Sequence, residues 1–406
     1  MTRRTVTALD KSFPVDCAGR EIDRLDAPLS SFATPLLALD GAAVEHNAAT
    51  MAAWTAERGL ELMPHGKTTM APALWRRQLE HGATGITVAT GWQADIALRA
   101  GVPTVQLANA CTDPALLNRL ADWLVDHPEQ EIALWADSIE TIDLLEAVAP
   151  TASLGVLTEL GAPGGRTGAR TRREALDVAE RVAGSRNLRL LGVAGYEGAL
   201  AHDRSGPGLA AVSAYLDSLV ELLDDVMPLV QGPAWITAGG SAYFDLVAEA
   251  LARAGDARKI LRSGAYLTHD DGFYADISPL SANAAGNDCE RLRSALRGYA
   301  RVISLPEPGL ALLDGGKRDF PFDEGLPVPL AIAPTLGDDE RPLHGEVTAM
   351  NDQHTFLRWD GDDRLNIGDV VRLGLSHPCT AFDKWRLVPV LDVRRGVVTE
   401  AVETFF

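Results

Sequence analysis

The sequence has no apolar run near the roughly 18 residues that a membrane-spanning helix requires, so no transmembrane segment is expected. Cysteine is scarce as well: four cysteines occur in 406 residues, at positions 17, 111, 289 and 379, without a CxxC spacing. The N-terminus carries basic residues but no apolar stretch after them, which excludes a secretory signal peptide. These features predict a cytoplasmic protein whose thiols stay reduced.

Positive charge is also in short supply. The 37 lysines and arginines are outnumbered by 56 aspartates and glutamates, which gives a formal net charge of −19. A protein that binds nucleic acid or an anionic membrane needs a basic face, so neither partner is expected. What is present is a hydrophobic fraction of 46% in a chain of 406 residues, enough for one large and one smaller domain, each with its own core.

Short apolar runs alternate with amphipathic helical segments through most of the first two thirds of the chain. A run at 35–40 is followed by a helical segment, and eight further runs begin at residue 61. Strands that alternate with helices form parallel βαβ units, and eight such units over about 200 residues are typical of an α/β fold, the (β/α)8 TIM-type barrel. An open doubly wound sheet is the alternative. The eight predicted strands lie at 61–67, 85–90, 104–109, 131–137, 153–160, 190–198, 234–241 and 259–266.

The pattern changes after residue 275. The remaining segments are rich in β-forming residues, are punctuated by Gly, Pro and Asp, and have no long helical period. They predict a second, mainly antiparallel β domain over 276–406, with the barrel at 35–275. Residues 1–34 are expected to form an N-terminal segment that packs with the β domain.

Candidate catalytic residues follow from one rule: in a parallel barrel, the chemistry lies at the C-terminal ends of the strands. Lys67 follows the first of the eight strands in "ELMPHGKTTMAP", where a lysine near a buried run needs a partner or a reaction. A nucleotide-binding P-loop is excluded there, because that motif needs a glycine at the position of Glu61. The other strand ends carry Arg166 in "GAPGGRTGAR", Tyr196, Thr237 to Ser241 in "TAGGS", and Arg262 to Tyr266 in "RSGAY".

The loops after the seventh and eighth strands are the usual phosphate site of such barrels. Glycines there let backbone N–H groups approach phosphate oxygens. A lysine across the barrel mouth from a phosphate site suits pyridoxal 5′-phosphate, whose aldehyde a lysine can hold as a Schiff base. The alternative for "TAGGS" is a tight turn without a ligand, and His65 either stacks near the cofactor or bonds within its own turn.

His377 and Cys379 in "GLSHPCTAFDKW" are the candidate metal ligands. With one residue between them, both side chains point to one face of an extended strand. Imidazole and thiolate together favour zinc over manganese or magnesium, and water or substrate would complete a catalytic site. The alternative is a core cysteine beside a packed histidine. Asp383 is either an orienting acid for this pair or an acid in a turn.

Four motifs together resemble a known family. They are "PHGKT" at 64–68, "GAPGGRTG" at 161–168, "TAGGS" at 237–241 and "SHPCTAFDKW" at 376–385. The chain resembles the D-serine dehydratase and D-threonine aldolase family of fold-type III pyridoxal-phosphate enzymes, with a barrel related to that of alanine racemase. It departs from the family's common motifs at Thr69, where a histidine is usual, and at Ser263, where a proline is usual. The "PCTAFDKWR" segment is similar to a subgroup described as amino acid deaminases.

The resemblance implies a role for each candidate residue. Lys67 would form the Schiff base, Arg166 would face the cofactor's ring oxygen, and Tyr196 would lie near its pyridine nitrogen. A divalent metal on His377 and Cys379 would contact the β-hydroxyl of a D-amino acid substrate, and the enzyme would be a homodimer. The remaining cofactor-binding residues would be His65 and Thr237, with Gly239, Gly240, Ser241, Gly264 and Tyr266 at the phosphate.

These residues suit α,β-elimination from a β-hydroxy D-amino acid such as D-serine, D-threonine or 3-hydroxyaspartate. Lys67 would remove the α-proton and the metal would assist departure of the hydroxyl, giving a 2-oxo acid and ammonia. Retro-aldol cleavage to glycine and an aldehyde is the alternative within the family. A non-catalytic carrier of the cofactor is an alternative of another class, and a racemase is disfavoured because it needs a second base. His354 in "NDQHTF" is a candidate acid or base at the substrate, or a loop histidine.

Overall fold

The computed structural model describes residues 4–148, 154–284, 289–359 and 364–406. The chain divides into two compact units, which we call the barrel unit and the β unit. The barrel unit contains residues 51–67 and 78–264. The β unit is assembled from three stretches, 1–50, 68–77 and 265–406. The predicted domain boundaries stay a prediction.

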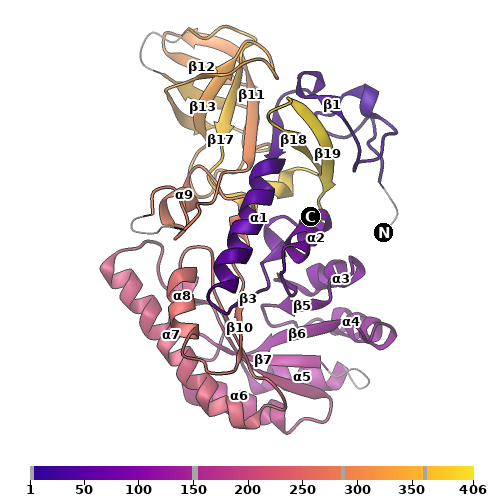
Figure 1. The fold of residues 1–406 in the computed structure, drawn as a ribbon, viewed down its shortest axis with the longest axis vertical. Helices are drawn as coiled ribbons and strands as arrows, with labels where there is room; N and C mark the ends of the chain where they lie inside the picture. The colour runs from indigo at the N-terminus through magenta and orange to yellow at the C-terminus, as the bar shows by residue number, and fades with distance from the viewer. Residues whose placement is uncertain (1–3, 149–153, 285–288, 360–363) are drawn as a thin grey trace. The chain divides into compact units, whose positions relative to one another are not determined.

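The barrel unit contains a sheet of eight parallel strands (Figure 1). In sequence order each strand pairs with the next from β4 to β10, and β10 pairs with β3. His65, just beyond β3, forms a parallel bridge to Thr87 in β4, which completes the ring. The predicted (β/α)8 fold is thereby confirmed. The strands are β3 (Glu61–Leu62), β4 (Ile86–Val88), β5 (Thr104–Leu107), β6 (Glu131–Ala136), β7 (Leu154–Leu160), β8 (Leu188–Gly195), β9 (Trp235–Ala238) and β10 (Arg258–Leu261).

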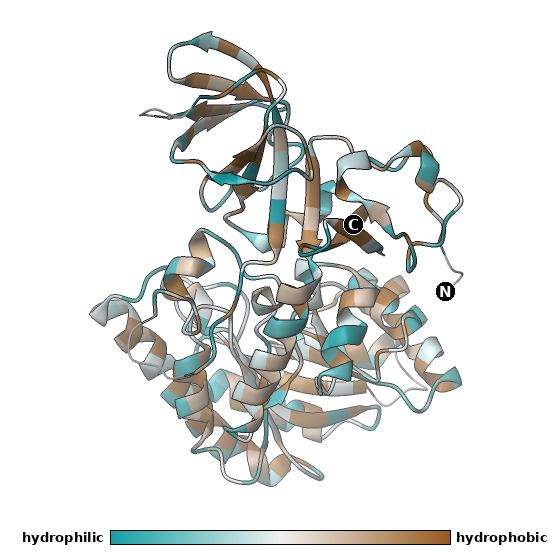
Figure 2. Cartoon of the chain, turned by 45° about the horizontal axis from the view of Figure 1, so that its top comes forward, coloured by the Kyte–Doolittle hydropathy of each residue, from teal (hydrophilic) through white to brown (hydrophobic). Residues whose placement is uncertain are grey.

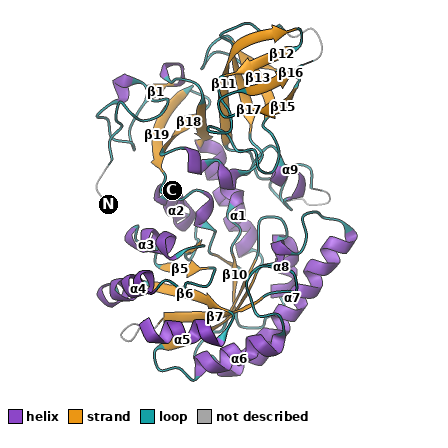
Figure 3. Ribbon diagram, turned by 180° about the vertical axis from the view of Figure 1, so that it is seen from behind, coloured by secondary structure: helices purple, strands orange, loops and turns teal. Residues whose placement is uncertain are grey.

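Helices connect successive barrel strands, as Figure 3 shows for α3 to α8. In α6 the Thr171 hydroxyl accepts from the Glu174 N–H and the Glu174 carboxylate accepts from the Thr171 N–H, so a capping box starts the helix. Figure 2 shows hydrophilic and hydrophobic residues alternating along such helices, as expected for one buried face. No described helix is long and apolar enough to cross a membrane. The helices are α1 (Gly41–Ala56), α2 (Pro72–Glu80), α3 (Gly91–Arg99), α4 (Pro114–Asp126), α5 (Ile139–Val148), α6 (Arg172–Ala183), α7 (Gly206–Val226) and α8 (Phe244–Leu251).

The β unit is built on a second sheet and contains the short helix α9 (Phe273–Ile277), together with residues 41–50 of α1 and 72–77 of α2. All strand pairs in this sheet are antiparallel except β18 with β2, which confirms the predicted antiparallel β domain. The strand at 36–40, which precedes the eight barrel strands, pairs here with β11 and β18. The strands are β1 (Ala27–Pro28), β2 (Leu36–Asp40), β11 (Leu296–Glu307), β12 (Leu310–Leu313), β13 (Val328–Ala333), β14 (Arg341–Pro342), β15 (Glu346–Met350), β16 (Thr355–Arg358), β17 (Val370–Gly374), β18 (Leu387–Asp392) and β19 (Val397–Glu403).

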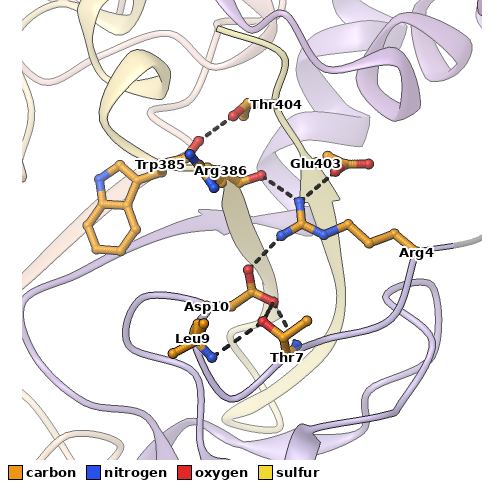
Figure 4. A network of polar contacts seen from close by, with 8 residues as sticks. All are labelled: Arg4, Thr7, Leu9, Asp10, Trp385, Arg386, Glu403 and Thr404. Atoms are coloured by element: carbon orange, nitrogen blue, oxygen red, sulfur yellow. Dashed lines mark hydrogen bonds and ion pairs between the residues drawn. The ribbon is translucent and has the colours of Figure 1, made fainter.

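The N-terminal segment is joined to the last strand of the β unit. Strand β1 pairs antiparallel with β19. Beyond it, the Arg4 guanidinium donates to the Glu403 carboxylate at 2.6 Å, to the Asp10 carboxylate at 2.5 Å and to the Arg386 carbonyl at 3.3 Å (Figure 4). The two ends of the β unit also share one apolar core, which is formed by residues from 6–38 and from 299–401.

Candidate active site

A cavity of about 180 Å³ opens where the strands of the barrel unit end. Its lining comes from the segments after β3, β4, β5, β7 and β8, together with residues on or next to β6 and β10. This is the C-terminal mouth of the barrel, the position predicted for the chemistry. The lining residues are His65, Lys67, Ala89, Ala108, Asn109, Trp135, Arg166, Thr167, Tyr196 and Arg262.

Positive charge gathers around His65. Lys67 lies in the 3-10 turn Gly66–Thr68 directly after β3, and Arg166 stacks on the Tyr196 ring, 4.3 Å from the guanidinium carbon to the ring centroid. Burial, then the charges of Lys67, Arg262 and Arg166, hold the pKa of His65 well below its usual value, so its imidazole is neutral. Three cations at one cavity favour an anionic ligand.

Arg262 is a site residue that sequence reasoning leaves without a role. It is 3% exposed, donates to the Thr237 hydroxyl at 2.7 Å and to the Gly195 carbonyl at 2.6 Å, and lies over the Trp135 ring. Burial lowers its pKa to about 10, with Glu197 acting in the opposite direction, so the guanidinium stays charged at neutral pH. The sequence does carry a signal for this residue, because Arg262 is the first residue of "RSGAY" at the end of a predicted strand, where site residues are expected.

Two of the residues predicted to bind phosphate donate their backbone N–H groups to a carboxylate in this structure. The N–H groups of Gly239 and Gly240 donate to the two carboxylate oxygens of Glu197, at 3.1 and 2.6 Å. Gly264 packs so closely on His65 that a Cβ atom there would lie 2.4 Å from the His65 carbonyl oxygen. Ser241 follows β9, whereas Tyr266 is buried in the turn Ala265–Leu267 of the β unit. Phosphate binding by these residues stays a prediction.

Several buried polar atoms near the strand ends have no hydrogen-bond partner within the described residues. Trp135 Nε1 and His65 Nδ1 belong to residues that line the cavity. Buried polar groups are normally paired, so these atoms mark the place of a polar ligand or water. The donors and cations together fit an anionic cofactor with a polar ring such as pyridoxal phosphate. The other such atoms of the barrel interior are Gln106 Nε2, Thr158 Oγ1 and Glu159 Oε2.

In the β unit, His377 and Cys379 come together with an acid from a distant segment. His377 Nδ1 lies 2.7 Å from an Asp323 carboxylate oxygen, and the other oxygen accepts from the Thr380 hydroxyl at 2.5 Å. The Thr68 hydroxyl lies 3.4 Å from the Cys379 sulfur. Burial lowers the pKa of His377, but Cys379 and Asp323 outweigh it and raise the pKa to about 9.

This pair fits a metal site that solvent or substrate would complete. The described residues contain no group of three or more His, Cys, Asp or Glu side chains that could hold an ion. A carboxylate on one ring nitrogen is a common arrangement for a metal-binding histidine, because it fixes the tautomer and leaves the other nitrogen as ligand. Asp323 has that place, whereas Asp383 is exposed and accepts from Lys384 at 2.9 Å. His354 is exposed in the turn between β15 and β16.

The fold is that of the alanine racemases. A solved alanine racemase from Bacillus anthracis superposes with a TM-score of 0.61 at 16% identity, covering 91% of this chain and 97% of that one. Within this fold, residues 295–391 match the family model described as a putative serine dehydratase domain.

Relatives that match over both units of the chain are named as aldolases or dehydratases, which are lyases. A solved D-threonine aldolase from Filomicrobium marinum is 26% identical, with a TM-score of 0.80 and coverage of 94% of this chain and 97% of that one. A solved D-threo-3-hydroxyaspartate dehydratase from Delftia sp. HT23 is 20% identical, with a TM-score of 0.75 and coverage of 93% and 99%. The 3-hydroxy-D-aspartate aldolase of Paracoccus denitrificans (strain Pd 1222) is 26% identical over 383 residues, 91% of this chain and 90% of that one. The predicted resemblance to the D-serine dehydratase and D-threonine aldolase family is confirmed, and with it the lyase class of the enzyme.

Proposed function

We propose that this protein is a lyase that uses pyridoxal 5′-phosphate and a divalent metal to eliminate water from β-hydroxy D-amino acids. The products are a 2-oxo acid and ammonia. One observation carries the proposal: Lys67 lines the same cavity as Arg166, Arg262 and the neutral imidazole of His65. An amine beside two guanidinium groups and unpaired buried donors matches a cofactor that has an aldehyde and an anionic group.

The residues of the cavity have separate tasks. Bound pyridoxal phosphate would supply an aldehyde that captures the substrate amine and a ring that accepts electrons from the α-carbon. Lys67, which lines the cavity, would take the α-proton on Nζ. Arg166 and Tyr196 stack on each other and would orient the cofactor, and the buried guanidinium of Arg262 would supply a fixed positive charge at the cavity.

The metal pair of the β unit would act on the leaving group. His377 and Cys379 would hold the ion, with zinc favoured because a thiolate prefers softer ions. As a Lewis acid the ion would stabilise the departing β-hydroxyl as it leaves with the C–O bonding electrons. The α-proton on Lys67 and the departing hydroxide together make one water, and hydrolysis of the enamine product releases ammonia.

Retro-aldol cleavage is the second candidate, and the names of the relatives favour it. The Paracoccus and Filomicrobium relatives are both named aldolases, whereas the Delftia relative is named a dehydratase. In that reaction the β-hydroxyl loses its proton and the Cα–Cβ bond breaks, giving glycine and an aldehyde. The same metal would serve by acidifying the hydroxyl.

Product analysis separates the two reactions. The purified protein, loaded with pyridoxal phosphate and zinc, is incubated with D-serine, D-threonine and D-3-hydroxyaspartate. We expect a 2-oxo acid and ammonia in equal amounts, while glycine formed without any release of ammonia would show that the reaction is aldol cleavage and not elimination. Lys67→Ala should abolish both the Schiff-base absorption band and turnover, with Lys259→Ala in β10, outside the cavity lining, as the matched control. A colourless wild-type protein without turnover would refute the lyase mechanism altogether.

Two further expectations belong to this proposal. The scattered cysteines favour a cytoplasmic location, and all four are free thiols in the structure. The family resemblance implies a homodimer, which sedimentation or light scattering would test.

A further inference from the structure

We infer that Glu197 is a positioning residue that holds the glycine corner after β9 in place, so that Gly239 and Gly240 serve this carboxylate and not the cofactor's phosphate. The inference rests on the proposed use of pyridoxal phosphate. It differs from the prediction from sequence, in which both glycines donate to the phosphate. The phosphate would then be held by other groups at the cavity.

Both carboxylate oxygens of Glu197 accept a hydrogen bond from the glycine pair after β9. Glu197 begins the 3-10 turn Glu197–Ala199 after β8 and is 0% exposed. One carboxylate oxygen accepts from the Gly240 N–H at 2.6 Å and the other from the Gly239 N–H at 3.1 Å. A carboxylate that accepts two backbone N–H groups in a buried place is a strong, directional contact.

The same corner is bound from its other side. The Ser263 hydroxyl donates to the Gly240 carbonyl at 2.9 Å, and Arg262 donates to Thr237 and to the Gly195 carbonyl. These bonds join the ends of β8, β9 and β10, and the loops after β9 and β10 carry the predicted phosphate site. Glu197 is also the acid that most favours the charged form of Arg262.

Displacement of Glu197 by phosphate would be unfavourable on two counts. The carboxylate would lose both N–H donors while still buried, and an unpaired buried charge is strongly destabilising. A phosphate on the same donors would also bring two anions into contact. The glycines have a separate reason to be glycine: Gly239 has a φ of +108°, and a Cβ atom there would lie 2.2 Å from a Leu261 methyl carbon.

The test compares two forms of the cofactor that differ only in the phosphate. Dissociation constants for pyridoxal phosphate and for pyridoxal are measured by absorbance on cofactor-free wild type, Glu197→Gln and Glu197→Ala. Glutamine has nearly the size of glutamate and keeps one acceptor oxygen, so Glu197→Gln removes one of the two hydrogen bonds to the glycines. Loss of a hydrogen bond to a charged group is large enough to lower the affinity for pyridoxal phosphate about tenfold. We expect Glu197→Gln to weaken pyridoxal phosphate binding about tenfold, Glu197→Ala to weaken it further, and pyridoxal binding to change less than about threefold. Glu221→Gln on α7 is the control, because Glu221 is exposed and outside the site.

Three results would overturn the inference. Equal losses for both ligands would mean that Glu197 acts on the fold alone, and tighter binding of pyridoxal phosphate by Glu197→Gln would mean that the carboxylate competes with the phosphate. Wild type that binds neither ligand would refute the proposed function itself, and the inference with it. Should Glu197→Ala fail to fold by circular dichroism, the nearly isosteric Glu197→Gln carries the comparison.

Discussion

Replacement of Glu159 by glutamine should make the protein more stable at alkaline pH. Glu159 lies in β7 and is 3% exposed. One carboxyl oxygen accepts from the Thr167 hydroxyl at 3.0 Å, while the other has no partner among the described residues. Burial raises the pKa of this carboxyl to about 7; Asp137 adds to the rise, and the Thr167 hydroxyl and the two guanidinium groups only partly oppose it.

The sign follows from proton binding in the two states. Between the usual pKa of 4.5 and the folded value of about 7, the folded protein holds a proton that the unfolded chain has released, so stability falls as pH rises. The difference between 4.5 and about 7 is about 2.5, and at about 1.4 kcal/mol for each pH unit it corresponds to about 3–4 kcal/mol. Glutamine cannot ionise and avoids this loss.

Urea unfolding of wild type and Glu159→Gln, followed by tryptophan fluorescence at about pH 5 and about pH 8.5, measures the effect. Wild type should lose about 2–3 kcal/mol more than the variant between the two pH values. Burial also raises the pKa of Asp270 to about 7. Because Asp270 is present in both proteins, the difference in their loss of stability reports on Glu159 alone. The control Glu140→Gln, on the exposed side of α5, should behave as wild type. Parallel pH profiles for Glu159→Gln and wild type would refute the assignment of a raised pKa to this carboxyl.

Two further substitutions test other parts of the structure. Asp323→Asn should weaken zinc binding about 10–100-fold in a chelator competition, since it removes the carboxylate that orients the metal-binding imidazole; Asp383→Asn should leave it unchanged, and equal effects of the two would contradict this role. Gly264→Ala should lower the free energy of unfolding by about 1–3 kcal/mol, because its Cβ atom would overlap a neighbouring carbonyl oxygen. Gly206→Ala, where a Cβ atom meets nothing within 4 Å, should be nearly neutral, and a similar loss there would exclude steric overlap as the cause.

The barrel was accessible from the sequence because its strands are buried on both faces. Such strands are near-continuous apolar runs, and the helices between them have their own period, so each unit is recognisable by itself. The strand-end rule then selects Lys67, Arg166 and Tyr196, and the structure brings all three to one cavity. The run at 35–40 has the same appearance as the barrel strands, but pairing with β11 and β18 puts it in the other sheet. The local pattern of apolar residues cannot tell whether such a strand belongs to the barrel sheet or to the sheet of the β unit.

The partners of the site residues were not accessible in the same way. Sequence proximity points to Asp383 as the acid near His377, whereas the acid that contacts the imidazole is 54 residues away, at position 323. Glu197 and Glu159 stand among apolar residues and give no sign of what their carboxyl groups contact. The partner of each carboxyl group depends on which strand ends lie next to each other in the closed barrel, and no single segment of the sequence shows this.

The discontinuity of the β unit determines the order in which the chain can fold during synthesis. The barrel unit needs only residues 51–67 and 78–264, so its core can assemble once that length has left the ribosome. Strand β2 must wait for β11, whose partner residues Leu36 and Tyr299 are separated by the whole barrel, and β1 must wait for β19 near the C-terminus. Residues 1–50 therefore emerge before the barrel unit, whereas the strands that pair with β1 and β2 emerge after it. Until β11 and β18 emerge, the apolar strand β2 has neither of its native partners and its edges are open to other strands.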